Sequence, residues 1–134
     1  MGTMSDTLVH TTIAPWLTVG DGAKAMAFYK EALGAAEVYR LDGDDGGVAV
    51  AQLKIGDAAF WIQEDVESSL ASIGRGSVRM ILTVGDPDAL FNRAIAAGST
   101  QVARVHDEHG WRTGRVTDPF GHDWEFSRPL ATSE

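Results

Sequence analysis

The chain has 134 residues, 44% of them apolar and 22% charged, and this composition predicts one globular domain with a real core. It contains no cysteine, which excludes disulfides, thiolate catalysis and cysteine metal sites. The net charge of −8 argues against a nucleic-acid groove, which needs a basic surface. The sequence also lacks a run of apolar residues long enough to span a membrane. We expect a cytoplasmic protein that contacts neither nucleic acid nor membrane.

The first half of the sequence predicts a strand, a helix and three more strands. Asp21 is placed to cap a helix over residues 22–33, and Gly34 follows where a helix commonly ends. Runs rich in β-branched and large apolar residues predict the strands. These strands are expected at residues 12–19, 35–41, 48–55 and 58–63.

The second half repeats that order. Asp86 precedes Pro87, which suits the first position of a helix over residues 87–97, and Gly98 follows its end. The segment HDEHGW at 106–111 is expected to be a loop. Strands are expected at residues 78–84, 99–105, 112–117 and 122–127.

The pentapeptide LTVGD occurs at 17–21 and again at 82–86, which relates the two halves by an offset of 65 residues. A single unit of about 60 residues has too small a core to be comfortably stable alone. The sequence therefore predicts an α+β fold in which tandem βαβββ modules form a curved mixed sheet around a cleft, with helices outside. We expect a single domain over residues 4–134. Its parts are module one at 8–64, a linker at 65–77 and module two at 78–130.

Two stretches carry a resemblance to a known family. One is IAPWLTVGDGAKAMAFYKEALGA at 13–35, and the other is RVTDPFGHDWEFSRP at 115–129, where DPFGH precedes an apolar strand. With the tandem architecture, they resemble the vicinal oxygen chelate superfamily of glyoxalase I, extradiol dioxygenases, fosfomycin-modifying enzymes and bleomycin-resistance proteins. The closest likeness is to the uncharacterised glyoxalase-like (PhnB-like) branch. The resemblance implies a small-molecule cleft and a symmetric homodimer.

The resemblance also implies a divalent metal held by His or Glu from the first and last strand of each half. The positions that match are Ala14, Phe60, Arg79 and Glu125. Glu125 alone could be a ligand, and Arg79 would repel a cation. The other candidates, His106 with His109 in a weak H-x-x-H spacing, His122 after the turn and the distant His10, do not rebuild the site. We expect neither a metal nor another cofactor.

Arg79 and Glu125 suggest two alternatives. They form a buried ion pair that replaces the metal, or one or both hold a polar group of a ligand. Strand alternation predicts an apolar and aromatic cleft, with Trp61 and Trp124 in the core. Trp16 either stacks on a ligand or fills the space beside Ala14. Trp111, expected in a loop, lines the rim, contacts a second subunit or packs locally. The predicted ligand-binding residues are Trp16, Phe60, Ile62, Arg79, Ile81, Trp111 and Glu125.

Two functions fit these features. The first is a metal-independent binding protein that sequesters an aromatic or cationic compound such as an antibiotic, as the bleomycin-resistance proteins do. The alternative is a lyase, isomerase or dioxygenase that uses a non-standard metal site or acid–base chemistry of Glu125 and Arg79. The missing ligands, the aromatic lining and the negative charge favour the binding protein. We therefore lean against an enzyme.

Overall fold

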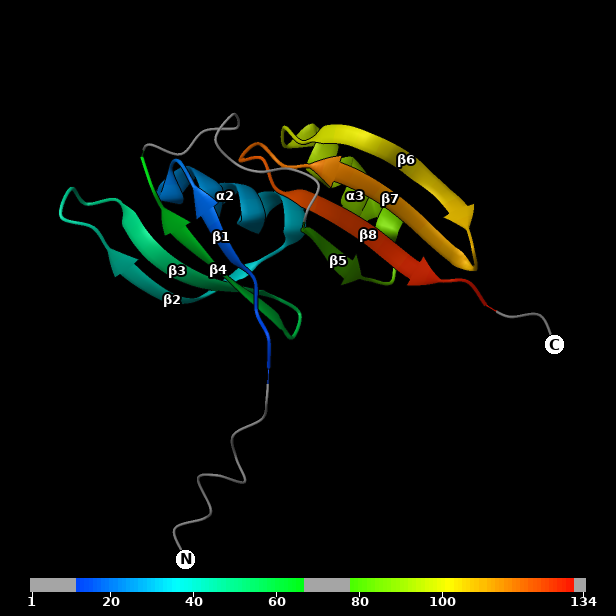
Figure 1. The fold of residues 1–134 in the computed structure, drawn as a ribbon, viewed down its shortest axis with the longest axis horizontal. Helices are drawn as coiled ribbons and strands as arrows, with labels where there is room; N and C mark the ends of the chain where they lie inside the picture. Colours follow the sequence, from blue (N-terminus) through cyan, green and yellow to red (C-terminus); the bar gives the residue numbers. More distant parts are fainter. Residues whose placement is uncertain (1–11, 67–77, 132–134) are drawn as a thin grey trace, which may run out of the picture.

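The computed structural model describes residues 12–66 and 78–131, and these form two βαβββ modules side by side (Figure 1). The α+β fold class predicted from the repeat is confirmed. Module one contains β1 (Trp16–Val19), α2 (Gly22–Leu33), β2 (Ala36–Asp42), β3 (Val48–Ile55) and β4 (Ala58–Glu64). Module two contains β5 (Arg79–Thr83), α3 (Pro87–Ala96), β6 (Thr100–Glu108), β7 (Trp111–Thr117) and β8 (Asp123–Pro129).

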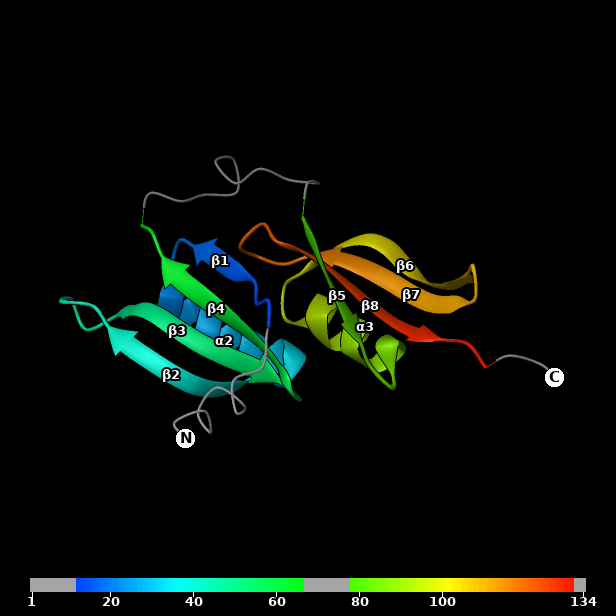
Figure 2. The same cartoon turned by 60° about the horizontal axis from the view of Figure 1, so that its bottom comes forward.

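Each module forms a four-stranded mixed sheet with one helix on one of its faces (Figures 1 and 2). Sheet A has the strand order β1-β4-β3-β2, and sheet B has the matching order β5-β8-β7-β6. The first and last strands of each module pair in parallel, and the other neighbours are antiparallel. Neither α2 nor α3 is long and apolar enough to cross a membrane.

The two copies of LTVGD end a strand and begin a helix, as predicted. The side chain of Asp21 accepts a hydrogen bond of 3.0 Å from the backbone N–H of Lys24. Asp86 accepts one of 3.1 Å from the N–H of Ala89. Each aspartate thus satisfies a free backbone donor in the first turn of its helix. Gly34 ends α2 in the left-handed region, with φ of 69°, where a side chain would be disfavoured.

One aromatic cluster joins the modules into a single core. Tyr29 of α2 contacts Phe60 of β4 at 5.3 Å and Trp124 of β8 at 5.8 Å between ring centroids. Phe60 and Trp124 are themselves 5.6 Å apart. The helices also meet, since the Arg93 guanidinium donates a 2.7 Å hydrogen bond to the carbonyl of Glu31. The predicted core position of Trp124 is confirmed.

A buried carboxylate connects the turn before β8 to both modules. The Asp118 carboxylate accepts hydrogen bonds from the Tyr29 hydroxyl at 2.6 Å and from the Trp124 indole at 2.9 Å. Its other oxygen accepts from the backbone N–H groups of Phe120 and His122. Burial, together with the adjacent Asp118 charge, raises the pKa of Tyr29 well above its usual range. The hydroxyl therefore stays protonated and keeps donating to Asp118.

Several predicted boundaries are wrong. The segment at 106–111 is not a loop, because β6 continues to Glu108 and β7 begins at Trp111. Only His109 and Gly110 make the turn, and both have positive φ. The first strand begins at Trp16 rather than at residue 12, and α3 ends at Ala96. Most of the predicted linker, together with His10, lies outside the described residues.

Candidate functional site

Each sheet has a free face, the face opposite its helix. On β1, Leu17 and Val19 are buried beneath α2, and Trp16 points the other way. The pairing register sets Trp61 of β4 beside Trp16. We call the free side of sheet A the aromatic face. It is formed by Trp16, Tyr39, Gln52, Trp61 and Gln63.

The aromatic face presents three connected rings. Trp16 stacks on Trp61 with ring centroids 5.8 Å apart and planes inclined by 26°. Tyr39 meets the other side of Trp61 edge-on at 6.0 Å. The indole N–H of Trp16 donates a 2.9 Å hydrogen bond to the side-chain oxygen of Gln63, which fixes the ring orientation. Trp16 is 52% exposed and Tyr39 is 47% exposed, so the rings are open to a planar ligand.

The predicted orientation of β4 is wrong. Phe60 and Ile62 were expected to face the cleft, but both are buried in the core, and Trp61 lies on the free face instead. Trp16 pairs with Trp61 in the way that Ile81 pairs with Glu125. Trp61, not Phe60, is therefore the positional equivalent of Glu125. Shifting a strand by one residue exchanges its two faces, which explains the error.

The free side of sheet B is polar. Arg79 and Ile81 lie on it from β5, and Arg79 Nε is 3.0 Å from Glu125 Oε1. The predicted contact is present, but the pair is not buried as expected, because the Glu125 side chain is 17% exposed and that of Arg79 40% exposed. Whether it also holds a ligand stays a prediction.

Alternation along β7 and β8 completes this surface. Gly114 and Val116 face α3, as does Arg112, which pairs with Asp88 at the start of that helix. Trp111, Thr113, Arg115 and Thr117 must therefore point to the free side. The partly exposed Trp111 thus lies on a strand at the sheet surface. We call this side of sheet B the polar face. It is formed by Arg79, Ile81, Trp111, Thr113, Arg115, Thr117, Asp123, Glu125 and Ser127.

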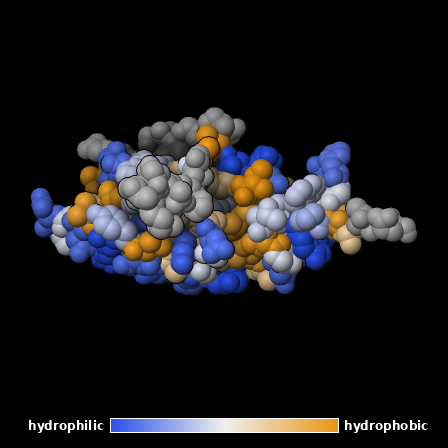
Figure 3. Space-filling model, turned by 90° about the horizontal axis from the view of Figure 1, so that it is seen from below, coloured by the Kyte–Doolittle hydropathy of each residue, from blue (hydrophilic) through white to orange (hydrophobic). Residues whose placement is uncertain are grey.

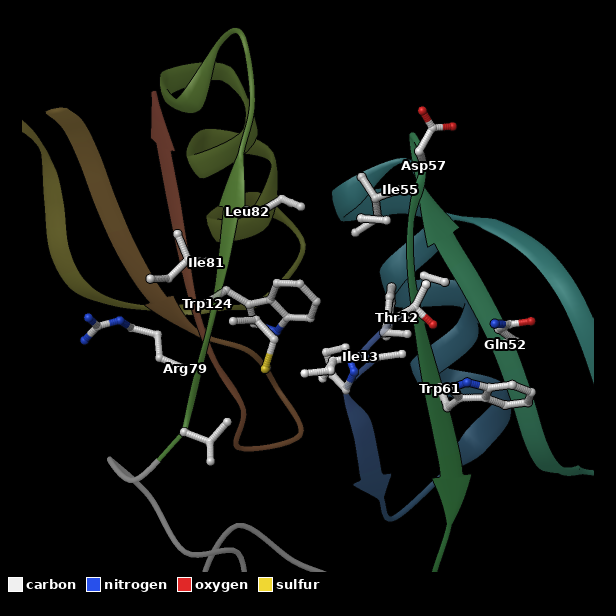
Figure 4. A pocket seen from close by; sticks show the side chains of 17 residues that line it. Thr12, Ile13, Gln52, Ile55, Asp57, Trp61, Arg79, Ile81, Leu82 and Trp124 are labelled. Carbon is white, nitrogen blue, oxygen red and sulfur yellow. The ribbon is translucent and has the colours of Figure 1, made fainter. Parts of the chain in front are cut away.

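A groove of about 970 Å³ separates the modules. Figure 4 shows Leu82 and Trp124 pointing toward it from module two, and Ile55 from module one. Arg79 and Ile81 also border the groove but extend from the side of β5 opposite Leu82, and Trp61 and Gln52 border it but extend from the side of β4 opposite Ile55 (Figure 4). The aromatic and polar faces therefore open in different directions within one chain. Apolar side chains also reach the surface over both modules (Figure 3).

The residues at the metal positions that the resemblance implies do not fit a divalent cation. With the register corrected, these positions are Ala14, Trp61, Arg79 and Glu125, of which only the glutamate offers a ligand atom. The three described histidines do not compensate. Among the described residues there is no group of three or more His, Asp or Glu side chains that could hold a metal.

Hydrogen bonds account for two of these histidines. The ring of His106 bonds the carbonyl of Arg104 and the carboxylate of Glu108, each at 2.7 Å. His122 Nε2 lies 2.8 Å from the carbonyl of Thr18, where it links the turn before β8 to β1. Both residues thus have structural contacts within the chain.

Comparison with known proteins gives a consistent result. The model of the Glyoxalase/Bleomycin resistance protein/Dioxygenase superfamily matches residues 7–126. An uncharacterized protein of Mycobacterium tuberculosis is 38% identical over 130 residues, covering 91% of this chain and 76% of the relative. An uncharacterized protein of Arabidopsis thaliana is 34% identical over 122 residues, covering 81% of this chain and 70% of the relative.

Two solved structures resemble this chain in their fold. TioX from Micromonospora sp. ML1 has a TM-score of 0.72 at 27% identity, covering 90% of this chain and all (100%) of that one. The fosfomycin resistance protein FosX from Listeria monocytogenes has a TM-score of 0.71 at 18% identity, covering 91% of this chain and 95% of that one. At this identity the second likeness concerns the fold alone.

Proposed function

Since the chain belongs to the glyoxalase/bleomycin resistance protein/dioxygenase superfamily, we propose that it is a metal-independent protein that binds a planar aromatic small molecule. The observation that carries this proposal is the aromatic face. Trp16, Trp61 and Tyr39 form a continuous, partly exposed aromatic surface, with Gln63 as a hydrogen-bonding neighbour. Aromatic side chains with a few placed polar groups are the usual lining of a small-molecule site. An antibiotic sequestered in the cytoplasm is one compound of this class.

The working unit in this proposal is a homodimer. The aromatic and polar faces open apart in one chain, and large apolar side chains lie exposed on both, including Trp16 and Ile81. A twofold arrangement would set sheet A of one copy opposite sheet B of the other. Because such an interface is isologous, it would create two equal clefts. Light scattering coupled to size-exclusion chromatography should give the mass of a dimer, and a monomer at micromolar concentration would contradict this assembly.

Ligand binding is tested by screening planar aromatic compounds, among them naphthalene-2-carboxamide, by tryptophan fluorescence and calorimetry. The Trp16→Ala variant should bind each hit at least about tenfold more weakly, because a stacked aromatic pair contributes roughly 0.5–1.5 kcal/mol beyond the apolar area that it buries. Ile13→Ala is the matched control, since it removes an exposed apolar side chain from the groove between the modules.

The two variants separate the aromatic face from the groove. If Ile13→Ala weakens binding while Trp16→Ala does not, the ligand occupies the groove and the proposed site is wrong. If the screen yields no ligand, the proposed function itself fails. Recovery of each bound compound by mass spectrometry checks that it leaves the protein unchanged.

The Arg79–Glu125 pair supports a second candidate, a lyase or isomerase that works by acid–base chemistry. The pair is close, at 3.0 Å, and both side chains reach the polar face. This candidate predicts that a bound compound emerges chemically altered. It also predicts that Glu125→Gln stops the conversion while binding is retained. Binding without conversion in the unaltered protein favours the sequestering function.

A further inference from the structure

Three unpaired hydrogen-bonding groups meet on the polar face. Arg115 Nε, Thr113 Oγ1 and Ser127 Oγ are buried, and the structure gives them no hydrogen-bond partner among the described residues. Buried polar atoms are nearly always paired, so each exception calls for an explanation. The fourth such atom, Ser99 Oγ, lies elsewhere, after α3.

The three groups are neighbours in the sheet. Thr113 pairs directly with Ser127 across β7 and β8, and Arg115 pairs with Glu125 in the next row on the same side. Ser127 is 1% exposed, whereas Arg115 borders solvent. They therefore form one cluster that reaches from the core of sheet B to its surface.

Arg115 also lacks a charge partner within the described residues. Glu125 lies beside it in the register, but its carboxylate is engaged by Arg79 from the other neighbouring strand. The second carboxylate of the polar face, Asp123, accepts a 2.7 Å hydrogen bond from Thr117. A guanidinium has only donors to offer, and hydroxyl groups can join it as donors. The hydroxyl groups are neutral, so the cluster has no anionic acceptor to match the charge of Arg115.

A carboxylate has the chemistry that this cluster lacks. It presents two oxygens with about four acceptor positions, which suits the planar donor fork of an arginine and two hydroxyl groups. The ring that carries it would lie close by, since Trp111 and Ile81 flank the polar residues on the same face. A cationic head group would be repelled by the positive charge of Arg115.

We propose that Arg115, Thr113 and Ser127 form a subsite for a carboxylate group of the ligand. This inference rests on the proposed function, because it places the acid group of an aromatic ligand opposite the aromatic face of a second copy. It names the ligand as an aromatic carboxylic acid rather than a cation. The net negative charge of the protein does not prevent a carboxylate from binding here. Distant surface charges are screened by salt, whereas the donors of the cluster act at contact distance.

The test compares naphthalene-2-carboxylate with naphthalene-2-carboxamide on the intact protein. The carboxylate should bind at least about tenfold more tightly than the amide. Arg115→Gln should remove this preference and leave amide binding unchanged. Arg128→Gln is the matched control, because Arg128 is exposed at a position of β8 that alternates to the opposite side of the sheet from Ser127.

A second pair of variants separates binding from folding. Thr113→Val and Ser127→Ala should weaken carboxylate binding severalfold without lowering the melting temperature, since each removes a hydroxyl that is unpaired in the free protein. A fall in melting temperature with unchanged binding would indicate a structural role and overturn the proposal.

The remaining outcomes are also decisive. Equal binding of acid and amide, no binding of the acid, or equal losses for both probes in Arg115→Gln would each overturn the carboxylate subsite. Amide binding that is lost in Trp16→Ala would still support the proposed function. Failure of the subsite is thereby distinguished from failure of the binding protein.

Discussion

The Tyr29→Phe variant tests the connection between the two modules. It removes only the hydroxyl that donates the 2.6 Å hydrogen bond to Asp118, and it keeps a ring of the same shape in a fully buried position. The ring contacts to Phe60 and Trp124 should remain. Any loss of stability therefore reports the hydrogen bond to the buried carboxylate.

The expected loss follows from the partners of Asp118. Hydrogen bonds to charged groups contribute about 1.5–3 kcal/mol. Three donors, from Phe120, His122 and Trp124, still bond the carboxylate after the change, so the loss should lie toward the lower end of that range. We expect the free energy of unfolding to fall by about 2 kcal/mol, which for a domain of this size corresponds to roughly 6–10 °C in melting temperature.

Urea denaturation and differential scanning calorimetry measure these two quantities. Tyr39→Phe is the matched control, since it deletes the same hydroxyl from an exposed ring on the aromatic face. Its free energy of unfolding should stay within about 0.5 kcal/mol of the parent protein. A Tyr29→Phe variant as stable as the control would refute the contribution assigned to the buried hydrogen bond.

Four other predictions concern charge and metal. Burial and a neighbouring carboxylate raise the pKa of Tyr29, so its stabilising contribution is present below pH about 10 and is lost as pH rises toward the folded-state pKa. Alkaline denaturation should therefore be less steep in Tyr29→Phe. A backbone carbonyl and Glu108 raise the pKa of His106, so Glu108→Gln should lower the pKa in an NMR titration, and an unchanged value would contradict the contact. Arg112→Lys loses a two-bond fork on Asp88 and should lower the midpoint of urea denaturation slightly, whereas a chelator should leave the melting temperature unchanged.

Elements defined by local signals could be predicted from the sequence. The aspartate caps, the glycine that ends α2 and the repeated LTVGD depend on neighbours within a few residues, and they predicted the order of the elements. The contact of Arg79 with Glu125 was predicted from the family resemblance instead. The orientation of β4 failed because it depends on how distant strands pair. Gly56 and Gly121 both precede the last strand of a module, but their turns differ in length. Ile55 pairs with Ala58 across a two-residue turn, whereas Thr117 pairs with Asp123 across a longer one.

Several residues of the candidate site could not be predicted from the sequence. Trp61 and Tyr39 reach the aromatic face only through the register of sheet A, and a prediction built on the pairing of β1 with β4 would have found Trp61. Thr113 and Ser127 carry no motif at all. Their significance comes from a missing partner, which requires coordinates to detect.

The buried carboxylate of Asp118 makes the two modules different from each other at the turn before the last strand. The turn of module two places this group against Tyr29 of module one, whereas the corresponding turn of module one ends in an exposed Asp57. A chain assembled from two copies of module one would leave the Tyr29 hydroxyl buried without its acceptor. The two halves share their order of elements, but they are complementary parts that are not interchangeable, because each supplies one partner of the Tyr29–Asp118 hydrogen bond.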